Sequence, residues 1–442
     1  MLENREIGEF APKRDICFVV PSDVVARNFI LSGAFEDLAE RCNLVFFVSK
    51  NVTLEFPGKS IFIEPKLLKS YFLRRIDILF WFHSLYLFMR KHNLRDQDSF
   101  KVSKLSWLGK RVHEILALPF FSWIVEKLDH ILFRKDAVVL NYLLNLSPDL
   151  LILPGVAIDN FSHIFLRTAN YSSVPTLMVV THWDYFTKKG LLRTVPNKIF
   201  VWGEDMRESV LRNESIDPSN VRIIGVPHFE KYMSELPKKD VAKRNLGVNL
   251  RCRWFFFPGA SLPFDEVSVI ERLVKFFEKN SMDSVGIIYR PHPKAWSRLT
   301  KSKTGALKSL PNIFVDLSTD TTDQHFRNLL GSSEAIISPF STMILEGGVC
   351  GLPSFCLGFS DEVNSWDWSQ VNDFEHLRPL RDRQWVTICD KTEQLEEMFH
   401  KFLKKIDKNG KLNVREGVSK TVYFNEISYS KRFASEIENI LK

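Results

Sequence analysis

Two short segments of this 442-residue chain combine residue types that can hold a phosphate group. Tyr289–Pro293 supplies a planar guanidinium, an imidazole and two prolines that stiffen the backbone between them. Ser338–Glu346 supplies three hydroxyls and a carboxylate around a short apolar run. Hydroxyls and free N–H groups at the start of a helix bind anions, because the positive end of the helix dipole lies there. The candidate phosphate ligands are Arg290, His292, Ser338, Ser341 and Thr342.

A third segment, Trp254–Ser261, ends in a turn of small residues. Gly259 and Ser261 could bring backbone amides and a hydroxyl to the same phosphates. All three segments follow or include an apolar run typical of a buried parallel strand, as in 285–288 and 335–337. Ligands of open α/β sheets bind at the carboxyl ends of such strands. We therefore expect the three segments to meet at one edge of a sheet.

Each residue also has an ordinary structural explanation. An isolated Arg290-Pro-His292 turn would be solvated, Ser341 would cap a helix, Glu346 would lie on its surface, and Gly259 would form a common turn. A shared site explains in addition why all of them follow strands of one strand–helix repeat. We favour the shared interpretation, in which Glu346 accepts hydrogen bonds from two ribose hydroxyls.

With these residues in view, the chain resembles glycosyltransferases of the GT-B type, within the superfamily of UDP-glycosyltransferases and glycogen phosphorylase. The His-Pro element with a downstream Ser/Thr pair is similar to that of bacterial sialyltransferases, capsule-building transferases and the glycerophosphotransferases of teichoic acid synthesis. The resemblance implies that His292, Ser341 and Thr342 contact the phosphates of a nucleotide-sugar donor and that Glu346 binds its ribose. It also implies an α/β fold with two Rossmann-like lobes, whose parallel sheets face a central cleft.

A second similarity concerns the segment between the expected lobes. It is carried by Val180–Asp184, Lys188–Gly190, Ile199–Glu204 and Val221–Pro227, in the order found in the inter-domain half of bacterial surface-polysaccharide transferases. Such transferases imply a glycan or lipid-linked glycan acceptor. Residues 50–140 resemble no known segment, so the sequence does not define the acceptor.

The order of apolar runs and helical segments predicts two lobes, and 45% hydrophobic content is enough for two cores. Residues 1–236 would form an N-terminal, acceptor-binding lobe. It would open with a strand over Asp15–Val20, a helix over Val24–Arg41 and a second strand over Leu44–Val48. Residues 250–423 would form the C-terminal, nucleotide-donor-binding lobe, after a polar, basic linker at Leu236–Arg244. Apolar spacing in residues 424–442 predicts a helix, and in GT-B enzymes such a tail crosses back to the first lobe.

Residues 66–136 form a basic, aromatic-rich helical insertion in the first lobe. They contain fourteen Lys/Arg and seven Asp/Glu, a surplus equal to the formal charge of +7 of the whole chain. Such helices can lie on an anionic bilayer or receive a lipid-linked acceptor. Equally, they can cover the sheet with their aromatic residues inward and their basic residues outward. The longest uncharged run, Ile78–Met89, is too short to span a membrane, and no nucleic-acid-binding motif accompanies the charge, so we expect no nucleic-acid partner.

The catalytic base is the least defined element. An inverting enzyme of this type needs a carboxylate or imidazole of the first lobe near the acceptor hydroxyl. Asp184 is the preferred candidate, followed by His182 and Asp159, with Asp23 also placed after a strand. The structural alternatives are a packed hinge for His182 and an N-cap for Asp159. Asp96–Asp98 resembles a metal-binding pair, but it lies between basic helical stretches, so we expect neither a metal nor another cofactor.

Cysteine usage and the N-terminus bear on the compartment. The six cysteines have no metal-ligand spacing and no framework of pairs, and the polar N-terminus is no signal peptide. We expect a cytoplasmic protein, with possible contact at the inner face of the cell membrane, that transfers a sugar to a surface polysaccharide. Two alternatives stay open: a CDP- or CMP-dependent transferase of glycerophosphate, sialic acid or Kdo, and a non-catalytic GT-B scaffold that binds nucleotide or glycan.

Overall fold

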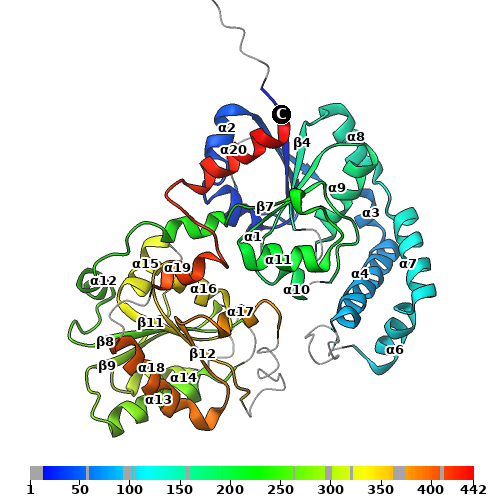
Figure 1. Cartoon of the computed structure of the whole chain (residues 1–442). Coiled ribbons are helices and arrows are strands. Elements are labelled where there is room, and N and C mark those ends of the chain that lie inside the picture. Colours follow the sequence, from blue (N-terminus) through cyan, green and yellow to red (C-terminus); the bar gives the residue numbers. More distant parts are fainter. Residues whose placement is uncertain are drawn as a thin grey trace, which may run out of the picture.

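Two parallel α/β sheets form two lobes in the computed structural model (Figure 1). The structure describes residues 13–55, 59–92, 102, 105–155, 159–188, 190–261, 264–293, 301–318, 322–361, 374–408 and 413–442. The seven-stranded sheet has the order β3-β2-β1-β4-β5-β6-β7, and the six-stranded sheet has the order β10-β9-β8-β11-β12-β13. Strands pair in parallel throughout both sheets. The predicted fold class is therefore confirmed.

The first lobe contains the larger sheet. Its strands are β1 (Asp15–Val20), β2 (Asn43–Ser49), β3 (Lys59–Ile63), β4 (Leu150–Pro154), β5 (Thr176–Val179), β6 (Lys198–Val201) and β7 (Val221–Ile223). Its helices are α1 (Asp23–Val25), η1 (Ala26–Ile30), α2 (Glu36–Arg41), α3 (Lys66–Lys69), α4 (Tyr71–Lys91), α6 (Trp107–Leu116), α7 (Pro119–Leu132), α8 (Ala137–Leu146), α9 (Asn160–Tyr171), α10 (Tyr185–Lys188), α11 (Glu204–Asn213), η3 (Pro218–Asn220) and η4 (Pro227–Tyr232). The central strands are apolar on both faces because helices cover both sides of the sheet.

The second lobe contains the smaller sheet. Its strands are β8 (Arg253–Pro258), β9 (Val285–Arg290), β10 (Ile313–Val315), β11 (Ser333–Pro339), β12 (Ser354–Leu357) and β13 (Val386–Cys389). The elements around it are α12 (Lys239–Leu246), α13 (Glu266–Lys279), α14 (Lys301–Ser309), α15 (Asp323–Gly331), α16 (Thr342–Val349), α17 (Arg378–Arg381), η7 (Thr392–Gln394), α18 (Leu395–Lys408) and α19 (Val414–Ser419). A last helix, α20 (Tyr429–Leu441), follows.

Two local predictions differ from the structure. The single helix expected over Val24–Arg41 is wrong: α1, the π-helical η1 and α2 are separated by a turn at Gly33, whose φ of 79° ends the first helical stretch. The Ser32 hydroxyl, 2.7 Å from the Asn28 carbonyl oxygen, competes with a further helical turn. The expected linker Leu236–Arg244 contains the first residues of α12, so it is partly helical.

The chain returns to the first lobe through residues 420–425. The Tyr423 N–H donates to the Trp202 carbonyl oxygen at 2.7 Å. A Cβ atom at Gly203 would lie 2.4 Å from the Lys420 carbonyl oxygen, and one at Gly225 would lie 2.3 Å from that of Tyr423. Both glycines belong to the segments that resemble an inter-domain region. Their lack of a side chain is what lets the returning backbone approach.

Helix α20 then lies beside α2 at the far end of the first lobe (Figure 1). The Phe433 ring meets those of Phe35 and Phe200 edge to face, and it is fully buried. Arg41 and Glu438 form an exposed ion pair at 2.7 Å. The last helix of the chain thus completes the core of the first lobe.

Helices α4, α6 and α7 form one outer side of the first lobe (Figure 1). A buried ionic cluster joins them to the sheet. The Arg193 guanidinium donates to Asp77 of α4 at 2.6 Å and to Asp129 of α7 at 3.1 Å, and Arg167 of α9 also pairs with Asp129. All four side chains are at most 8% exposed. Two arginines and two aspartates therefore balance each other's charge at this junction.

The six cysteines are unpaired, and five of them are buried. Within the described ranges, no helix has the length and apolar character needed to cross a membrane.

Candidate functional site

The three segments singled out in the sequence meet at one edge of the second sheet. Strands β9, β8 and β11 are neighbours, and Pro258 at the end of β8 pairs in register with Arg290 at the end of β9. The Gly259 N–H donates to the Arg290 carbonyl oxygen at 2.8 Å. On the other side, the Ser338 hydroxyl lies 3.5 Å from the Pro258 carbonyl oxygen. Their carboxyl ends thus form a single surface, with Ser261 exposed at its margin.

A buried carboxylate holds the first two segments together. Glu266, the first residue of α13, accepts from the Ala260 N–H at 2.5 Å and from the Tyr289 hydroxyl at 2.6 Å. A Cβ at Gly259 would lie 2.7 Å from the His292 backbone nitrogen and 2.8 Å from a Glu266 carboxylate oxygen. Only glycine fits between them. The sequence analysis missed Glu266, although an acidic residue opening a helix just after the small-residue turn was a usable signal.

The N-terminus of α16 faces this edge. Ser341 holds the N-cap position, but its side chain makes no capping hydrogen bond; its hydroxyl lies 3.1 Å from that of Ser338. Thr342 is the first helical residue. Helix α16 packs closely on β11, because a Cβ at Gly347 would lie 2.5 Å from Ile336. The Ser341 hydroxyl therefore contacts Ser338 and does not cap the helix, which the structural alternative required.

Arg290 is placed differently from the expectation of an open anion-binding fork. Its guanidinium pairs with Asp316, which follows the neighbouring strand β10 and is 3% exposed. Asp316 also lies 2.9 Å from the His325 imidazole. One side of the Arg290 fork is thus engaged by an internal carboxylate, because β9 and β10 end side by side. His292 is half-buried at the same edge.

Glu346, one turn into α16, contacts the segment that joins the lobes. Its carboxylate accepts from the Tyr232 hydroxyl of η4 at 2.7 Å. Burial raises the pKa of Glu346, and the hydrogen bond from Tyr232 and the positive charges of Lys231 and Arg27 act in the opposite direction. Arg27 belongs to η1, which follows the first strand of the first lobe. The Glu346 carboxylate is therefore buried and interacts electrostatically with Arg27 of the first lobe, unlike the surface group that the structural alternative predicts.

Two of the carboxylates considered as a base have structural partners. Asp159 caps α9, where it accepts from the N–H groups of Phe161 at 3.2 Å and Ser162 at 2.9 Å. Burial raises its pKa. Asp23 accepts from the N–H of Thr53 at 2.8 Å and so fixes the loop after β2. The N-cap alternative for Asp159 is thus what the structure shows.

His182 and Asp184 lie together in the loop after β5, and both are half-buried. Their neighbour Trp183 meets the ring of His376, from the second lobe, edge to face at 4.9 Å. This contact fits the packed-hinge alternative for the loop, yet it leaves His182 and Asp184 near the junction of the lobes.

His228 is a further histidine at this junction, and the sequence analysis missed it. Burial is the main cause that lowers its pKa to about 3, with contributions from Lys231, His182 and Arg27. Its imidazole is therefore neutral near pH 7, and its buried Nδ1 atom has no hydrogen-bond partner among the described residues. It follows the Gly225-Val-Pro segment directly, which was the only sequence signal.

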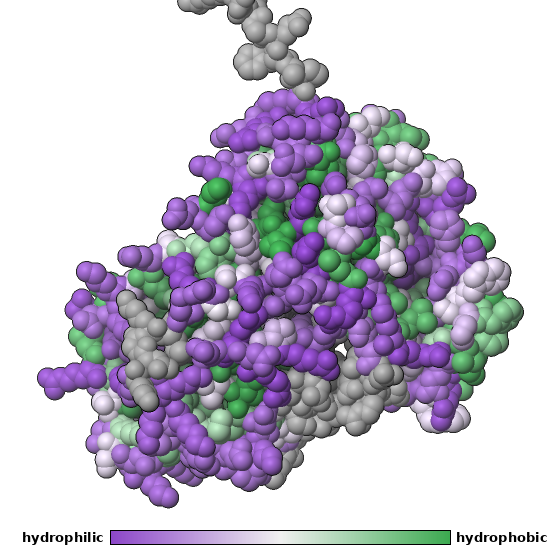
Figure 2. All heavy atoms as spheres, in the orientation of Figure 1, coloured by the Kyte–Doolittle hydropathy of each residue, from purple (hydrophilic) through white to green (hydrophobic). Residues whose placement is uncertain are grey.

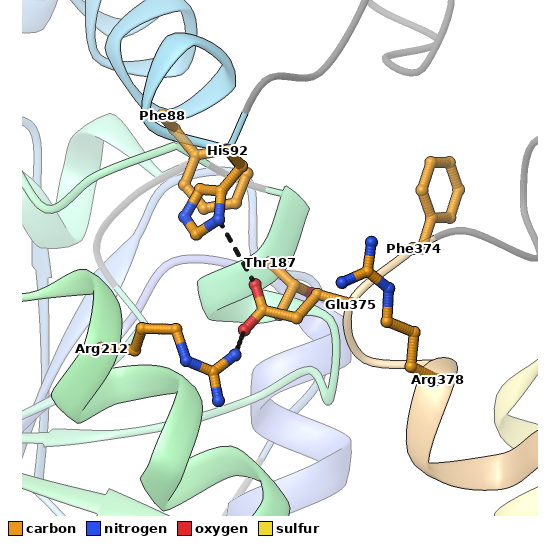
Figure 3. A pocket seen from close by; sticks show the side chains of 7 residues that line it. All are labelled: Phe88, His92, Thr187, Arg212, Phe374, Glu375 and Arg378. Atoms are coloured by element: carbon orange, nitrogen blue, oxygen red, sulfur yellow. Dashed lines mark hydrogen bonds and ion pairs between the residues drawn. The ribbon is translucent and has the colours of Figure 1, made fainter.

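A pocket of about 180 Å³ lies where the end of α4 meets the second lobe (Figure 3). The end of α4 provides Phe88 and His92, and the second lobe provides Glu375, which pairs with Arg212 of α11 and lies 3.9 Å from the His92 ring nitrogen. The remaining lining residues are Thr187, Phe374 and Arg378. With aromatic walls and two arginines, the pocket suits a small polar or anionic group.

The pair Asp96–Asp98, for which the sequence predicts no metal, lies outside the described residues. Among the residues that the structure does describe, no group of three or more His, Cys, Asp or Glu side chains could hold a metal ion.

No protein-family model matches the chain, and no curated protein matches it either. Solved structures do. UDP-GlcNAc 2-epimerase from Methanocaldococcus jannaschii is 14% identical, with a TM-score of 0.53 over 97% of this chain and 99% of that one. The fold is GT-B. A glycosyltransferase from Rickettsia africae is 12% identical, with a TM-score of 0.50 over 98% of both chains. MurG from Acinetobacter baumannii is 11% identical, with a TM-score of 0.50 over 97% of this chain and 100% of that one.

Proposed function

We propose that this GT-B protein is a metal-independent glycosyltransferase that moves a sugar from a nucleotide-activated donor to a surface polysaccharide or lipid-linked glycan. The observation that carries the proposal is the meeting of the Gly259 turn, His292 and the N-terminus of α16 at one sheet edge. Parallel sheets bind ligands at this edge, and a helix N-terminus favours phosphate. Several structural neighbours are enzymes named for UDP-sugars, and one is a Staphylococcus aureus MnaA structure with UDP, which supports a uridine nucleotide as the donor.

The leaving diphosphate would be stabilised by groups that are already in position. Ser341, Thr342 and the first N–H groups of α16 would donate to it, and His292 would add a hydrogen bond or a positive charge. Arg290, held by Asp316, would contribute its positive charge. Glu346 would accept from the donor ribose. Closure of the lobes would exclude water, so that transfer wins over hydrolysis.

For the acceptor side we favour the loop after β5 and the pocket beside it. Asp184 and His182 stay our candidates for the base, because Asp159 is occupied as a helix cap. The pocket lined by Arg212 and Arg378 would receive the acceptor glycan or its phosphate. A cytoplasmic location agrees with six unpaired cysteines.

The first experiment is a thermal-shift panel of UDP, CDP, CMP, GDP and ADP on the wild type and on His292→Ala. A ligand that binds only the folded state stabilises it and so raises its melting temperature. The stabilisation is about 2.7 kcal/mol at a ligand concentration of 100 times Kd. His130→Ala is the matched control, because His130 is exposed on α7, far from the sheet edge. We expect one nucleotide to stabilise the wild type and the control but not His292→Ala. If no nucleotide stabilises the wild type, the nucleotide-dependent function is wrong.

The identity of the stabilising nucleotide separates the alternatives. A response to CDP or CMP alone would favour transfer of glycerophosphate, sialic acid or Kdo. Because several neighbours are 2-epimerases, the sugar of a bound UDP-GlcNAc should also be followed by NMR without acceptor. Inversion at the C2 carbon of the sugar would show that the reaction is epimerisation and not transfer. Release of UDP that depends on added acceptor would support transfer. Binding with neither reaction would favour the non-catalytic scaffold.

A further inference from the structure

Helices α6 and α7 of the insertion have their polar residues facing the protein and their apolar residues facing outward. The buried residues of α7 are Ser122, Val125 and Asp129. On its exposed side lie Phe120 at 66%, Trp123 at 58% and Ile131 at 68% exposure, together with Phe121, Leu128 and Leu132. A helix that covers a soluble core shows the opposite distribution. Of the two alternatives for this region, the one with aromatic residues inward and basic residues outward does not hold for α7.

Helix α6 repeats the pattern. Its buried residue is His113, whose ring stacks on Tyr86 of α4 at 5.2 Å. Trp107 is 72% exposed, and Leu108, Val112 and Ile115 are exposed with it. The first turn of α4 adds exposed Tyr71 and Phe72. Figure 2 shows hydrophobic surface along the outer edge of the molecule over α7. We call these exposed residues of α4, α6 and α7 the outer apolar surface.

The polar residues inside the insertion explain this orientation. The Ser122 hydroxyl lies 3.2 Å from the His83 imidazole of α4, and Asp129 joins the buried ionic cluster with Arg167 and Arg193. Rotating α7 to bury Trp123 would turn Asp129 outward. Arg167 and Arg193 would then stay buried without the Asp129 carboxylate. The inward polar contacts thus fix the apolar side outward.

The exposed charge around the outer apolar surface is strongly basic. Three acidic residues of the insertion, Asp77, Asp129 and Asp136, are buried. The other acidic residues among the described part of 66–136 are Glu126, which is exposed, and Glu114, whose 43% exposed side chain pairs with Arg111. The exposed basic residues in the described part of this range are Lys66, Lys69, Arg74, Arg75, Arg90, Lys91, Arg111, Lys127, Arg134 and Lys135. Burial therefore removes negative charge from this side and leaves positive charge next to aromatic rings.

We propose that the outer apolar surface docks the protein on an anionic lipid bilayer. Large apolar patches mark interaction sites, and tryptophan and phenylalanine flanked by lysine and arginine suit the headgroup region of a bilayer. A second copy of this chain fits less well, because two such surfaces would bring like charges together. Docking here places one end of α4 at the bilayer and its other end, with His92, at the pocket between the lobes. This inference does not depend on the reaction proposed above.

The test is cosedimentation of the purified chain with vesicles of phosphatidylglycerol and phosphatidylcholine, and with phosphatidylcholine alone. We expect binding to the anionic vesicles that weakens with salt. Trp107→Ser/Phe120→Ser/Trp123→Ser should abolish it, and Arg74→Gln/Arg111→Gln/Lys127→Gln should weaken it on the order of 100-fold. The matched control, Lys275→Gln/Lys279→Gln/Lys404→Gln, removes the same charge from exposed positions of the second lobe and should bind normally.

Folding and self-association are followed on the same samples by circular dichroism and light scattering. Loss of binding counts only in variants whose melting curve is unchanged, and nucleotide-induced thermal shifts should persist in them. No binding of the wild type to anionic vesicles would overturn the proposal. A wild-type dimer that the Trp107/Phe120/Trp123 variant converts to a monomer, without vesicle binding, would assign the surface to a second copy instead.

Discussion

The buried ionic cluster gives the sharpest test of how the insertion is held. In Asp129→Asn, two guanidiniums, Arg167 and Arg193, would share the single carboxylate of Asp77 in a site that is at most 8% exposed. Removing one partner of a buried ion pair costs about 3 to 5 kcal/mol, because the remaining charge stays out of water. Asp129 contacts both arginines, so we expect a value near the upper end of that range.

Hydrogen exchange measured by mass spectrometry suits this test, because the two lobes need not unfold together. A loss of about 3 kcal/mol or more should lower the protection of α7 and of the first half of α4 by roughly 100-fold or more. The protection of the second lobe should not change. Glu397→Gln is the control, since it breaks the exposed Lys401–Glu397 pair and should leave exchange as it is.

A double variant separates the charge effect from a loss of packing. Asp129→Leu/Arg167→Met removes one positive and one negative group and leaves Arg193 paired with Asp77 at 2.6 Å. Replacing a buried pair by apolar residues is often neutral or stabilising, so this variant should retain more protection than Asp129→Asn. A change of less than tenfold in α7 for Asp129→Asn would refute the view that the cluster holds the insertion.

Three further predictions concern other parts of the chain. Burial raises the pKa of Glu214 from 4.5 to about 7. The contribution of protonated Glu214 to stability is therefore complete below pH 4.5 and is lost as the pH rises through 7, a fall of about 3 kcal/mol. Melting curves of Glu214→Gln measured across this pH range should lack this loss of stability. Gly259→Ala should push the His292 backbone away, abolish nucleotide-induced thermal shifts and keep the circular dichroism of the wild type; unchanged shifts would separate the turn from the site. Gly347→Val should lower the melting temperature through its clash with Ile336, whereas a normal melting curve would show that α16 can move away from β11.

Most of the fold could be predicted because parallel strands buried on both faces are continuous apolar runs. Phe255, Ile287 and Ile336 lie in such runs, and all three are fully buried. Strand β10 could not be identified in this way, because it is short and only half-buried at the edge of its sheet. The break at Gly33 depends on tertiary packing around η1, which helical periodicity does not contain.

The candidate site could be predicted only as far as strand ends define it. His292 and Ser341 follow strands, and chain order alone brings them to one edge. Their partners come from elsewhere: Asp316 turns the Arg290 fork inward, and Tyr232 reaches Glu346 from the segment between the lobes. Such pairings depend on side-chain direction across distant elements, and a single sequence does not encode them in its spacing.

The orientation of α7 was unpredictable for a related reason. Its sequence contains an apolar side and a polar side, and either could face the protein. The choice is made by Arg167 and Arg193, more than thirty residues further along the chain, which need the carboxylate of Asp129.

The position of α20 has a consequence for how the protein is made. Phe433 and Ile437 are fully buried in the first lobe, against residues such as Phe18 and Phe35. During synthesis the first lobe emerges first, yet this part of its core is supplied by residues 429–441. Until they have left the ribosome, the first lobe exposes an apolar groove beside α2. The lobe that is translated first is therefore the lobe that is completed last, and loss of α20 would damage the core of the first lobe.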